Sequence, residues 1–300
     1  MKRKIVKLGP ATLVISLPNK WVRKFNIVAG NELEVVEEEK GLIIKTESNF
    51  KTEKEFLDFT KINKLLKRIL ASKYTKGTDE IEIKIDSLEK SRIIQKRVDE
   101  MIGMEVIEQS KDRLLIKDIQ GTNIENFDNI LRRVLYLINS LSEESLKSIS
   151  KKETDLEYLQ DIEKNINKFT DYCFRILNKK GYANYKNTSA MYCIIYLLED
   201  LADEYKNLIS YINENKIKLN NELILIYSKI DDYYKNLQKL FLKFDLEDAV
   251  NLADYRDKII IFTSKQLKNT KSANEAIIIK NFERIIKIII DIMDQLLKTN

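Results

Sequence analysis

The chain contains very few residues that interrupt regular secondary structure: two prolines and seven glycines among 300 residues. A protein built mainly from strands needs many more turn residues, so this scarcity indicates long helices over most of the chain. A chain of this length is expected to form two or more domains, each with its own core.

The last part of the chain shows only helical spacing of its apolar residues. Six segments fit this spacing, with expected ranges of 122–148, 153–179, 186–214, 218–243, 245–268 and 272–298. Helices of about 25 residues with short connections form antiparallel bundles. We therefore expect residues 121–300 to form an all-α domain, built from two three-helix units in tandem.

The first part of the chain shows short β patterns instead. Within residues 1–48, strands are expected over 5–8, 11–17, 33–36 and 42–44, with about two helical turns over 19–25. Residues 49–120 are expected to form a small α/β middle region. Its expected elements are helices over 53–72 and 87–101, a strand over 80–85, and a hairpin of 105–108 with 113–116.

Charge is distributed unevenly along the first fifty residues. No acidic residue occurs between Met1 and Asn31, whereas this segment carries seven basic ones: Lys2, Arg3, Lys4, Lys7, Lys20, Arg23 and Lys24. Acidic residues begin at Glu32 and then follow closely. Such a switch within one small domain indicates a basic face of the kind that binds phosphate backbones. The alternative is a solubilising tail, but the cations alternate with strand residues that must fold.

The run Leu17–Val35 resembles the core of the AbrB/MazE/SpoVT family of swapped-hairpin proteins. It has a strand that ends at Pro18, then a basic helical turn, Ile27, a turn at Gly30 and an alternating strand. The resemblance covers about residues 3–46. Asn26 stands where the family usually has glycine, and Asn31 where aspartate is common; asparagine tolerates the left-handed backbone.

This resemblance implies a homodimer whose two chains interlace their hairpins and lay a basic surface on double-stranded DNA. By position, Arg23 and Lys24 match the paired basic residues that contact DNA in the family. Plausible further contacts are Arg3, Lys4, Lys7 and Lys20, and candidates for reading base edges are Arg23 and Asn19. Trp21 is expected to be a packing anchor rather than a base-stacking residue. The fold also serves toxin antidotes, but those are short chains without a large helical domain.

An acidic pair lies beside the apolar stripe of the segment 186–214. Glu199 and Asp203 are one helical turn apart, so they repel each other unless a cation lies between them. One interpretation is a solvated acidic flank with Lys206 nearby, and the other is a divalent metal or iron site. Oxygen ligands would have to suffice for such a metal, because the chain has no histidine and both cysteines, Cys173 and Cys193, are expected to be reduced core residues.

The run Leu198–Leu208 resembles the helix signature of the PhoU family, which implies metal binding by Glu199 and Asp203 and two three-helix repeats. The whole chain is similar to archaeal PhoU-related phosphate uptake regulators. It departs from that pattern at Asn167, where an acid is usual, and at Lys287, which we expect to form a salt bridge with Glu283. Asp254 and Asp257 are the remaining candidates for a second acidic cluster.

The leading hypothesis is a DNA-binding transcriptional regulator linked to phosphate homeostasis. The alternative is a PhoU-like adaptor that binds a phosphate transporter or sensor kinase, with DNA binding secondary or absent. An enzyme is the weakest hypothesis, because the sequence has no histidine, no nucleophile motif and no cofactor-binding loop. Without a leader pattern or a long uncharged apolar run, the chain is expected to be cytoplasmic and not inserted in a membrane.

Overall fold

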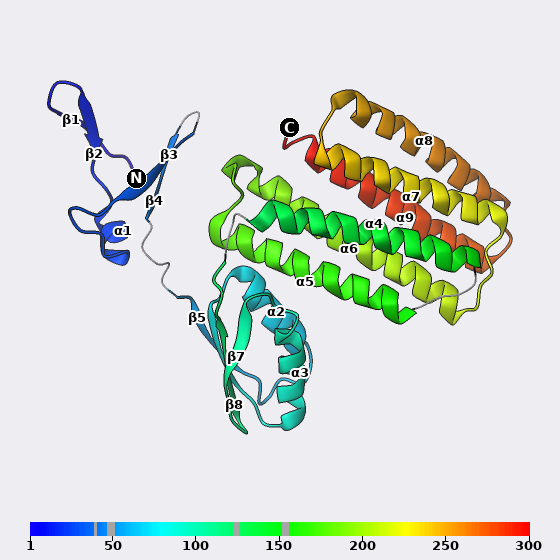
Figure 1. Ribbon diagram of the computed structural model, residues 1–300, viewed down its shortest axis with the longest axis horizontal. Helices are drawn as coiled ribbons and strands as arrows, with labels where there is room; N and C mark the ends of the chain where they lie inside the picture. The colour runs from blue at the N-terminus through cyan, green and yellow to red at the C-terminus, as the bar shows by residue number, and fades with distance from the viewer. Residues whose placement is uncertain (39–40, 47–51, 123–125, 152–155) are drawn as a thin grey trace. The chain divides into compact units, whose positions relative to one another are not determined.

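A computed structural model describes residues 1–38, 41–46, 52–122, 126–151 and 156–300. The chain divides into two compact units, Met1–Glu53 and Lys54–Asn300, whose elements are labelled in Figure 1. The expected domain boundary after residue 48 lies outside the described residues. The α/β region and the helical region, expected as separate domains, lie together in the second unit.

The first unit consists of two hairpins and one short helix. Its elements are β1 (Ile5–Leu8), β2 (Thr12–Ile15), α1 (Asn19–Lys24), β3 (Leu33–Glu38) and β4 (Gly41–Thr46). β1 pairs antiparallel with β2, and β3 pairs antiparallel with β4, as two separate two-stranded sheets. Asn26 adopts the left-handed backbone, with φ of 50°, so it takes the conformation for which glycine would otherwise be favoured. Part of the turn expected between β3 and β4, residues 39–40, lies outside the described residues.

The second unit begins with a four-stranded sheet and two helices. Its elements are β5 (Lys54–Asp58), α2 (Leu66–Lys76), β6 (Glu80–Lys84), α3 (Leu88–Val98), β7 (Met104–Gln109) and β8 (Arg113–Asp118). The strand order is β5-β6-β8-β7, with β5 parallel to β6 and the other neighbours antiparallel. The alternating Ile81, Ile83 and Ile85 are fully buried, as their spacing predicts.

The expected helix over residues 53–72 is wrong in its first part. Lys54–Asp58 is a strand that pairs with β6 from Lys54↔Glu80 to Asp58↔Lys84, and α2 begins only at Leu66. Two residues whose spacing indicated a buried face of that helix are exposed: Phe56 by 60% and Leu65 by 61%. The ladder with β6 stabilises an extended backbone here, and this partner is distant in sequence.

The rest of the second unit is a bundle of long helices. They are α4 (Phe127–Lys151), α5 (Leu156–Lys180), α6 (Thr188–Glu214), α7 (Asn221–Leu242), α8 (Leu246–Asn269) and α9 (Ala273–Leu296). Each range agrees with the expected one within a few residues, apart from the start of α4 at Phe127; the expected start at 153 lies outside the described residues. Side chains of Asn220, Asp245 and Ser272 cap α7, α8 and α9 at their N-termini, as these residue types favour.

The six helices form two three-helix units with the same internal contacts. α4, α5 and α6 pack against one another, and so do α7, α8 and α9. The two units meet where α4 contacts α7 and α6 contacts α9. Exchanging α4 with α7, α5 with α8 and α6 with α9 leaves this set of contacts unchanged.

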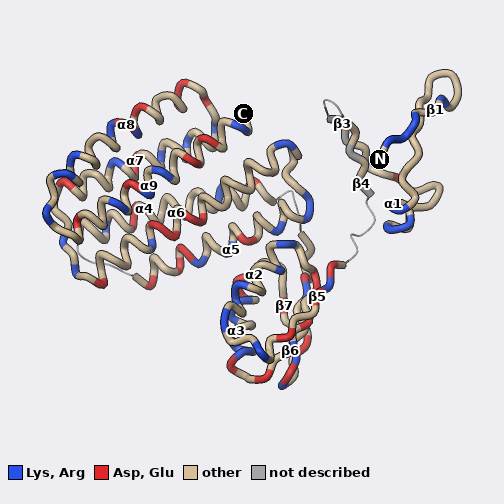
Figure 2. Tube along the Cα trace, turned by 180° about the vertical axis from the view of Figure 1, so that it is seen from behind, with Lys and Arg blue, Asp and Glu red and all other residues tan. Residues whose placement is uncertain are grey.

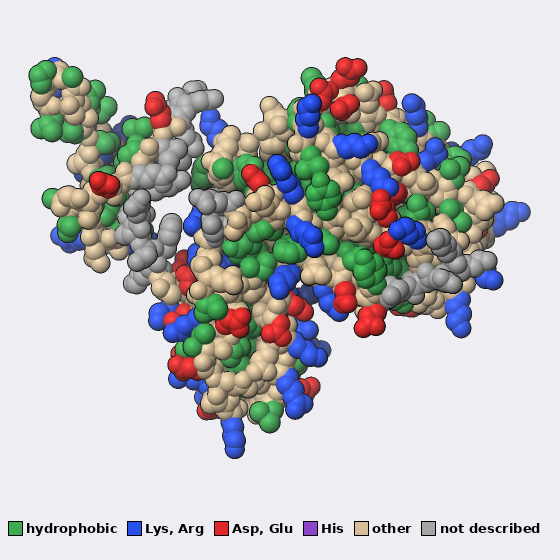
Figure 3. All heavy atoms as spheres, viewed as in Figure 1, with side chains coloured by type: hydrophobic (Ala, Val, Ile, Leu, Met, Phe, Trp, Pro, Cys, Tyr) green, Lys and Arg blue, Asp and Glu red, His purple; other side chains and the backbone are tan. Residues whose placement is uncertain are grey.

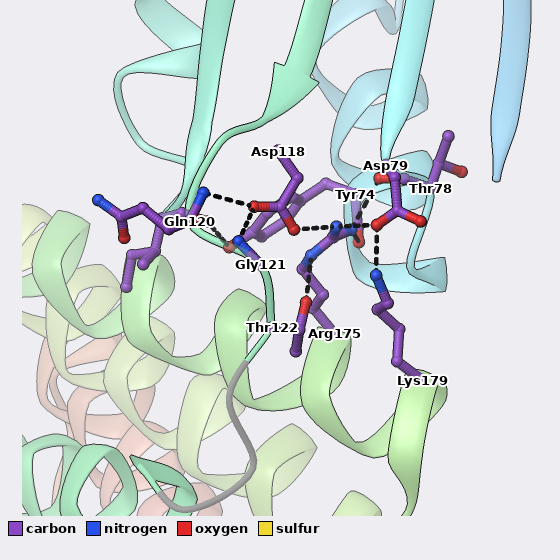
Figure 4. A network of polar contacts seen from close by, with 10 residues as sticks. Tyr74, Thr78, Asp79, Asp118, Gln120, Gly121, Thr122, Arg175 and Lys179 are labelled. Carbon is purple, nitrogen blue, oxygen red and sulfur yellow. Dashed lines mark hydrogen bonds and ion pairs between the residues drawn. The ribbon is translucent and has the colours of Figure 1, made fainter. Parts of the chain in front are cut away.

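A buried arginine joins α5 to the α/β region (Figure 4). The Arg175 side chain is fully buried, and its Nη2 donates to Asp79 Oδ1 at 2.9 Å and to Asp118 Oδ2 at 2.8 Å. Its remaining nitrogens donate to Thr122 Oγ1 and to the carbonyl oxygens of Tyr74 and Thr78. The guanidinium also lies over the Tyr74 ring, 5.0 Å from its centroid.

The two cysteines differ in their surroundings. Cys173 is buried in α5, as expected, but Cys193 is exposed on α6, so the expectation that both are core residues is wrong for Cys193. Cys193 follows Met191 by two positions on α6, which turns it away from the buried stripe. No helix among the described residues is long and apolar enough to cross a bilayer.

Candidate nucleic-acid interface

The residues expected to contact DNA fall on two segments of the first unit. Arg3 and Lys4 precede β1 and Lys7 lies in it, whereas the other four lie on α1: Asn19, Lys20, Arg23 and Lys24. All seven side chains are exposed, and Figure 2 shows the basic ones along the start of the chain and on α1. None of the basic ones forms an ion pair with another described residue; Lys24 lies 5.2 Å from the centroid of the Phe25 ring.

Helix α1 is held in place by local contacts. Val22 donates its backbone N–H to the Pro18 carbonyl at 3.0 Å, and Ile27 donates to the Val22 carbonyl at 3.0 Å. Trp21 is partly buried, and its ring centroid lies 5.7 Å from that of Phe25, which agrees with a packing role. These contacts leave Arg23 and Lys24 in the last turn, where the helix dipole favours cations.

The following turn is fixed by Asn31. Its Oδ1 accepts the backbone N–H of Val28, three residues earlier, at 2.8 Å, and its own backbone N–H donates to the Val28 carbonyl at 3.1 Å. Gly30 within this turn has φ of 95°, a conformation that L-residues with a side chain rarely adopt. The Asn31 side chain therefore closes the turn between α1 and β3.

The first unit exposes much of its apolar surface. No side chain described within Met1–Glu53 is buried, and nine large apolar ones are more than half exposed: Met1, Ile5, Val6, Leu8, Leu13, Ile15, Val28, Val35 and Leu42. Figure 3 shows hydrophobic side chains on the surface of this unit. Isolated two-stranded hairpins are marginally stable in water, and exposed apolar patches mark interaction surfaces. The apolar residues of this unit therefore offer an interaction surface.

Comparison with known proteins identifies this segment. Residues 6–52 match the family model of MazE, described as antidote-toxin recognition, a bacterial antitoxin. This match confirms the AbrB/MazE part of the resemblance, and it does not extend beyond residue 52. No curated protein and no solved structure matches the chain.

The matched segment, called here the MazE-like module, contains most of the candidate DNA-binding residues. Lys7, Asn19, Lys20, Arg23 and Lys24 lie inside it. Arg3 and Lys4 precede the matched segment by a few residues. The sequence therefore predicted the position of the module and the chemistry of its surface, whereas the role of each residue stays a prediction.

Outside the MazE-like module, the acidic pair of α6 lies next to a lysine. Lys206 Nζ donates to Asp203 Oδ1 at 2.5 Å and to Glu163 Oε1 of α5 at 2.8 Å. Asn167 Nδ2 donates to the same Glu163 oxygen at 2.7 Å. Burial, together with the nearby carboxylates of Asp171 and Asp203, raises the pKa of Glu199 to about 7.

The cation beside the acidic pair is thus the ammonium group of Lys206, which contacts Asp203. Among the described residues, no three Asp, Glu or Cys side chains are grouped so that they could hold a metal ion. Metal binding by Glu199 and Asp203 stays a prediction.

In α9, Glu283 accepts from Lys280 at 2.6 Å, and Lys287 pairs with Asp291. The expected bridge between Glu283 and Lys287 is therefore wrong, because each has a closer partner on its own helix.

Proposed function

We propose that this protein is a homodimeric, cytoplasmic DNA-binding regulator of transcription. The observation that carries the proposal is the match of residues 6–52 to the MazE model, together with exposed, unpaired cations on α1 and at the start of the chain. Fixed cations without acidic neighbours attract the phosphate backbone and release its counterions. Arg23 and Lys24 are the principal contacts, with Arg3, Lys4, Lys7, Asn19 and Lys20 as supporting ones.

The partner that completes the module is a second copy of the chain. The apolar side chains exposed on both hairpins would form a common core if two modules interlaced. Apolar area removed from water contributes about 25 cal/mol per Å², so burying the seven large side chains of the hairpins in each copy supports a stable dimer. A dimer also doubles the number of cations presented to one duplex.

The helical bundle is the sensing or partner-binding part in this proposal. Its two three-helix units support the PhoU-like interpretation, and the run Leu198–Leu208 carries the proposed link to phosphate uptake. We assign the chain no catalytic activity, in keeping with its lack of histidine.

A second candidate function is an adaptor for a phosphate transporter or sensor kinase. One observation favours it: Leu246, Val250 and Ile261 of α8 are each more than half exposed. These side chains offer an apolar surface to a partner protein. A capture experiment with the purified chain and the transporter or kinase of the same organism, repeated with Val250→Lys, tests this function.

DNA binding by the full chain is tested with a gel-shift assay over a series of salt concentrations. Arg23→Ala/Lys24→Ala should weaken binding at least tenfold and lower the slope of log K against log salt by about 0.9 per lost phosphate contact. The matched control is Lys258→Ala/Lys265→Ala on α8, which should bind as the wild type does. A dimeric wild-type protein that binds no DNA at about 50 mM salt contradicts the regulator function and leaves the adaptor function.

A further inference from the structure

A second basic surface lies on the α/β region of the second unit. Residues 59–78 contain six basic residues and no acidic one, a pattern similar to that of residues 1–31. We call the exposed cations of α2, α3 and the loop before α2 the basic helical face, formed by Lys61, Lys64, Lys67, Arg68, Arg92 and Lys96. Figure 2 shows Lys and Arg along both helices.

The cations of this face have no partners within the chain. None of the six forms an ion pair or a side-chain hydrogen bond with another described residue, whereas other cations of the same two helices do. Lys73 and Lys76 pair with Glu55, and Arg97 pairs with Glu100 and Asp171. The structure thus separates cations that stabilise the fold from cations that remain available to a ligand.

The geometry of the two helices directs the basic helical face outward. Leu66, Leu70 and Tyr74 are the buried residues of α2, and at 100° per residue Arg68 lies opposite to them. On α3 the buried residues include Ile94 and Val98, so that Arg92 and Lys96 lie on the opposite side, one turn apart. The acids exposed nearby are Asp58, Asp86, Glu89 and Asp99. Asp86 pairs with Lys90, so the six cations of the face exceed the acids that remain.

The spacing of the cations suits a phosphate backbone. α2 and α3 pack side by side, and packed helices have axes about 8–10 Å apart. The separation of the two rows of cations is therefore similar to the width of the DNA major groove, which is about 12 Å. Within each row, residues one turn apart are about 5–6 Å from each other, so successive side chains can contact different phosphates.

We propose that the basic helical face is a second DNA-binding surface, which contacts the phosphate backbone beside the site held by the MazE-like module. This inference rests on the proposed function of the module. The matched segment ends at residue 52 and the second unit begins at Lys54, so DNA bound by the module is tethered to the chain that carries the basic helical face. Phosphate contacts of this kind add affinity without reading sequence.

The test uses the full-length chain with Lys64→Gln/Lys67→Gln/Arg68→Gln and a linear duplex that extends well beyond the module's site. The three changes should weaken DNA binding roughly 10- to 100-fold at low salt and reduce the slope of log K against log salt by about 2–3, at 0.9 per contact. Lys258→Gln/Lys265→Gln/Lys268→Gln removes the same number of exposed cations from α8, and its slope should equal that of the wild type. Circular dichroism and urea unfolding establish that both variants fold.

Each outcome distinguishes this inference from the proposed function. If the wild type binds DNA and the α2 variant keeps the wild-type slope, the basic helical face does not contact DNA and the inference is overturned, while the function of the module stands. If the wild type binds no DNA at all, the proposed function itself fails. Binding of wild type, but not the α2 variant, to vesicles of anionic lipid with unchanged DNA binding would assign this surface to a membrane and overturn the inference too.

Discussion

Arg175 of α5 and Asp118 at the end of β8 form a buried ion pair, with 2.8 Å between Nη2 and Oδ2. The arginine side chain is fully buried and that of Asp118 is 5% exposed. The other Asp118 oxygen accepts the backbone N–H of Gly121 at 2.8 Å. This pair therefore connects the helical bundle to the sheet through groups that cannot reach water in the folded state.

Replacement of Arg175 should be strongly destabilising. Arg175→Met leaves the carboxylates of Asp79 and Asp118 without their buried cation, and breaking such a pair costs about 3–5 kcal/mol. Urea unfolding followed by circular dichroism measures the loss. Arg284→Met is the matched control, because Arg284 is 54% exposed and pairs with Asp200 and Glu204 on the surface. Its loss should stay below about 1 kcal/mol, and equal losses in the two variants would contradict the structural role of Arg175.

Glu199 should make the stability of the bundle depend on pH. Because burial raises its pKa to about 7 in the folded state, the unfolded chain ionises first as pH rises, and stability falls between about pH 4.5 and pH 7. Glu199→Gln removes this penalty. The variant should gain on the order of 1–3 kcal/mol over the wild type at pH 8, where Glu199 is ionised, and much less at pH 5.

Urea unfolding of both proteins at the two pH values measures this difference. Asp161→Asn is a suitable control, because Asp161 is exposed on α5 and pairs with Lys164 on the surface. A constant difference between Glu199→Gln and the wild type from pH 5 to pH 8 would show that Glu199 does not titrate in this range.

The two thiols should react with a disulfide reagent at very different rates. Cys193 is exposed, whereas Cys173 is fully buried, and burial raises the pKa of the Cys173 thiol. Since the thiolate is the nucleophile, the native protein should show one fast thiol and the urea-unfolded protein two. Cys193→Ser should abolish the fast reaction; a fast thiol that persists in this variant would disprove the buried position of Cys173.

The exposed apolar residues of the MazE-like module should be essential for the proposed dimer. Leu13 lies in β2 and is 67% exposed in one copy; if a second copy covers it, Leu13→Asp should convert the dimer to a monomer and weaken DNA binding. Light scattering after size-exclusion chromatography measures the mass. Ile261→Asp on α8, at 71% exposure, is the control that should remain dimeric. A dimeric Leu13→Asp variant would place the interface elsewhere.

The elements that the sequence predicted well are those fixed by local patterns. The six long helices follow from apolar spacing that repeats over about seven turns in each segment, and the N-terminal strands follow from β-branched runs bounded by Gly9-Pro10 and Pro18. The charge switch at Glu32 located the candidate interface, because backbone binding depends on the distribution of charge more than on any single residue.

The elements that it missed depend on partners far apart in the chain. The strand Lys54–Asp58 is stabilised by β6, which begins at Glu80, and the spacing of Phe56 and Phe59 fits a helix equally well when read alone. Arg175 looks like an ordinary surface arginine of an amphipathic helix until Asp79 and Asp118 are brought to it by the sheet. The sequence placed Lys206 near Asp203, but it did not predict that Lys206 also pairs with Glu163 and so links α6 to α5.

The lack of any buried side chain among the described residues of Met1–Glu53 has a consequence for how the protein responds to its own abundance. In the proposed dimer, folding of the module and pairing of two chains are one event, so the folded fraction depends on protein concentration. Below the dissociation constant of the dimer, the helical bundle persists while the DNA-binding surface is absent. The number of copies in the cell then acts as a threshold for occupying DNA, and dilution alone can release a site without any effector.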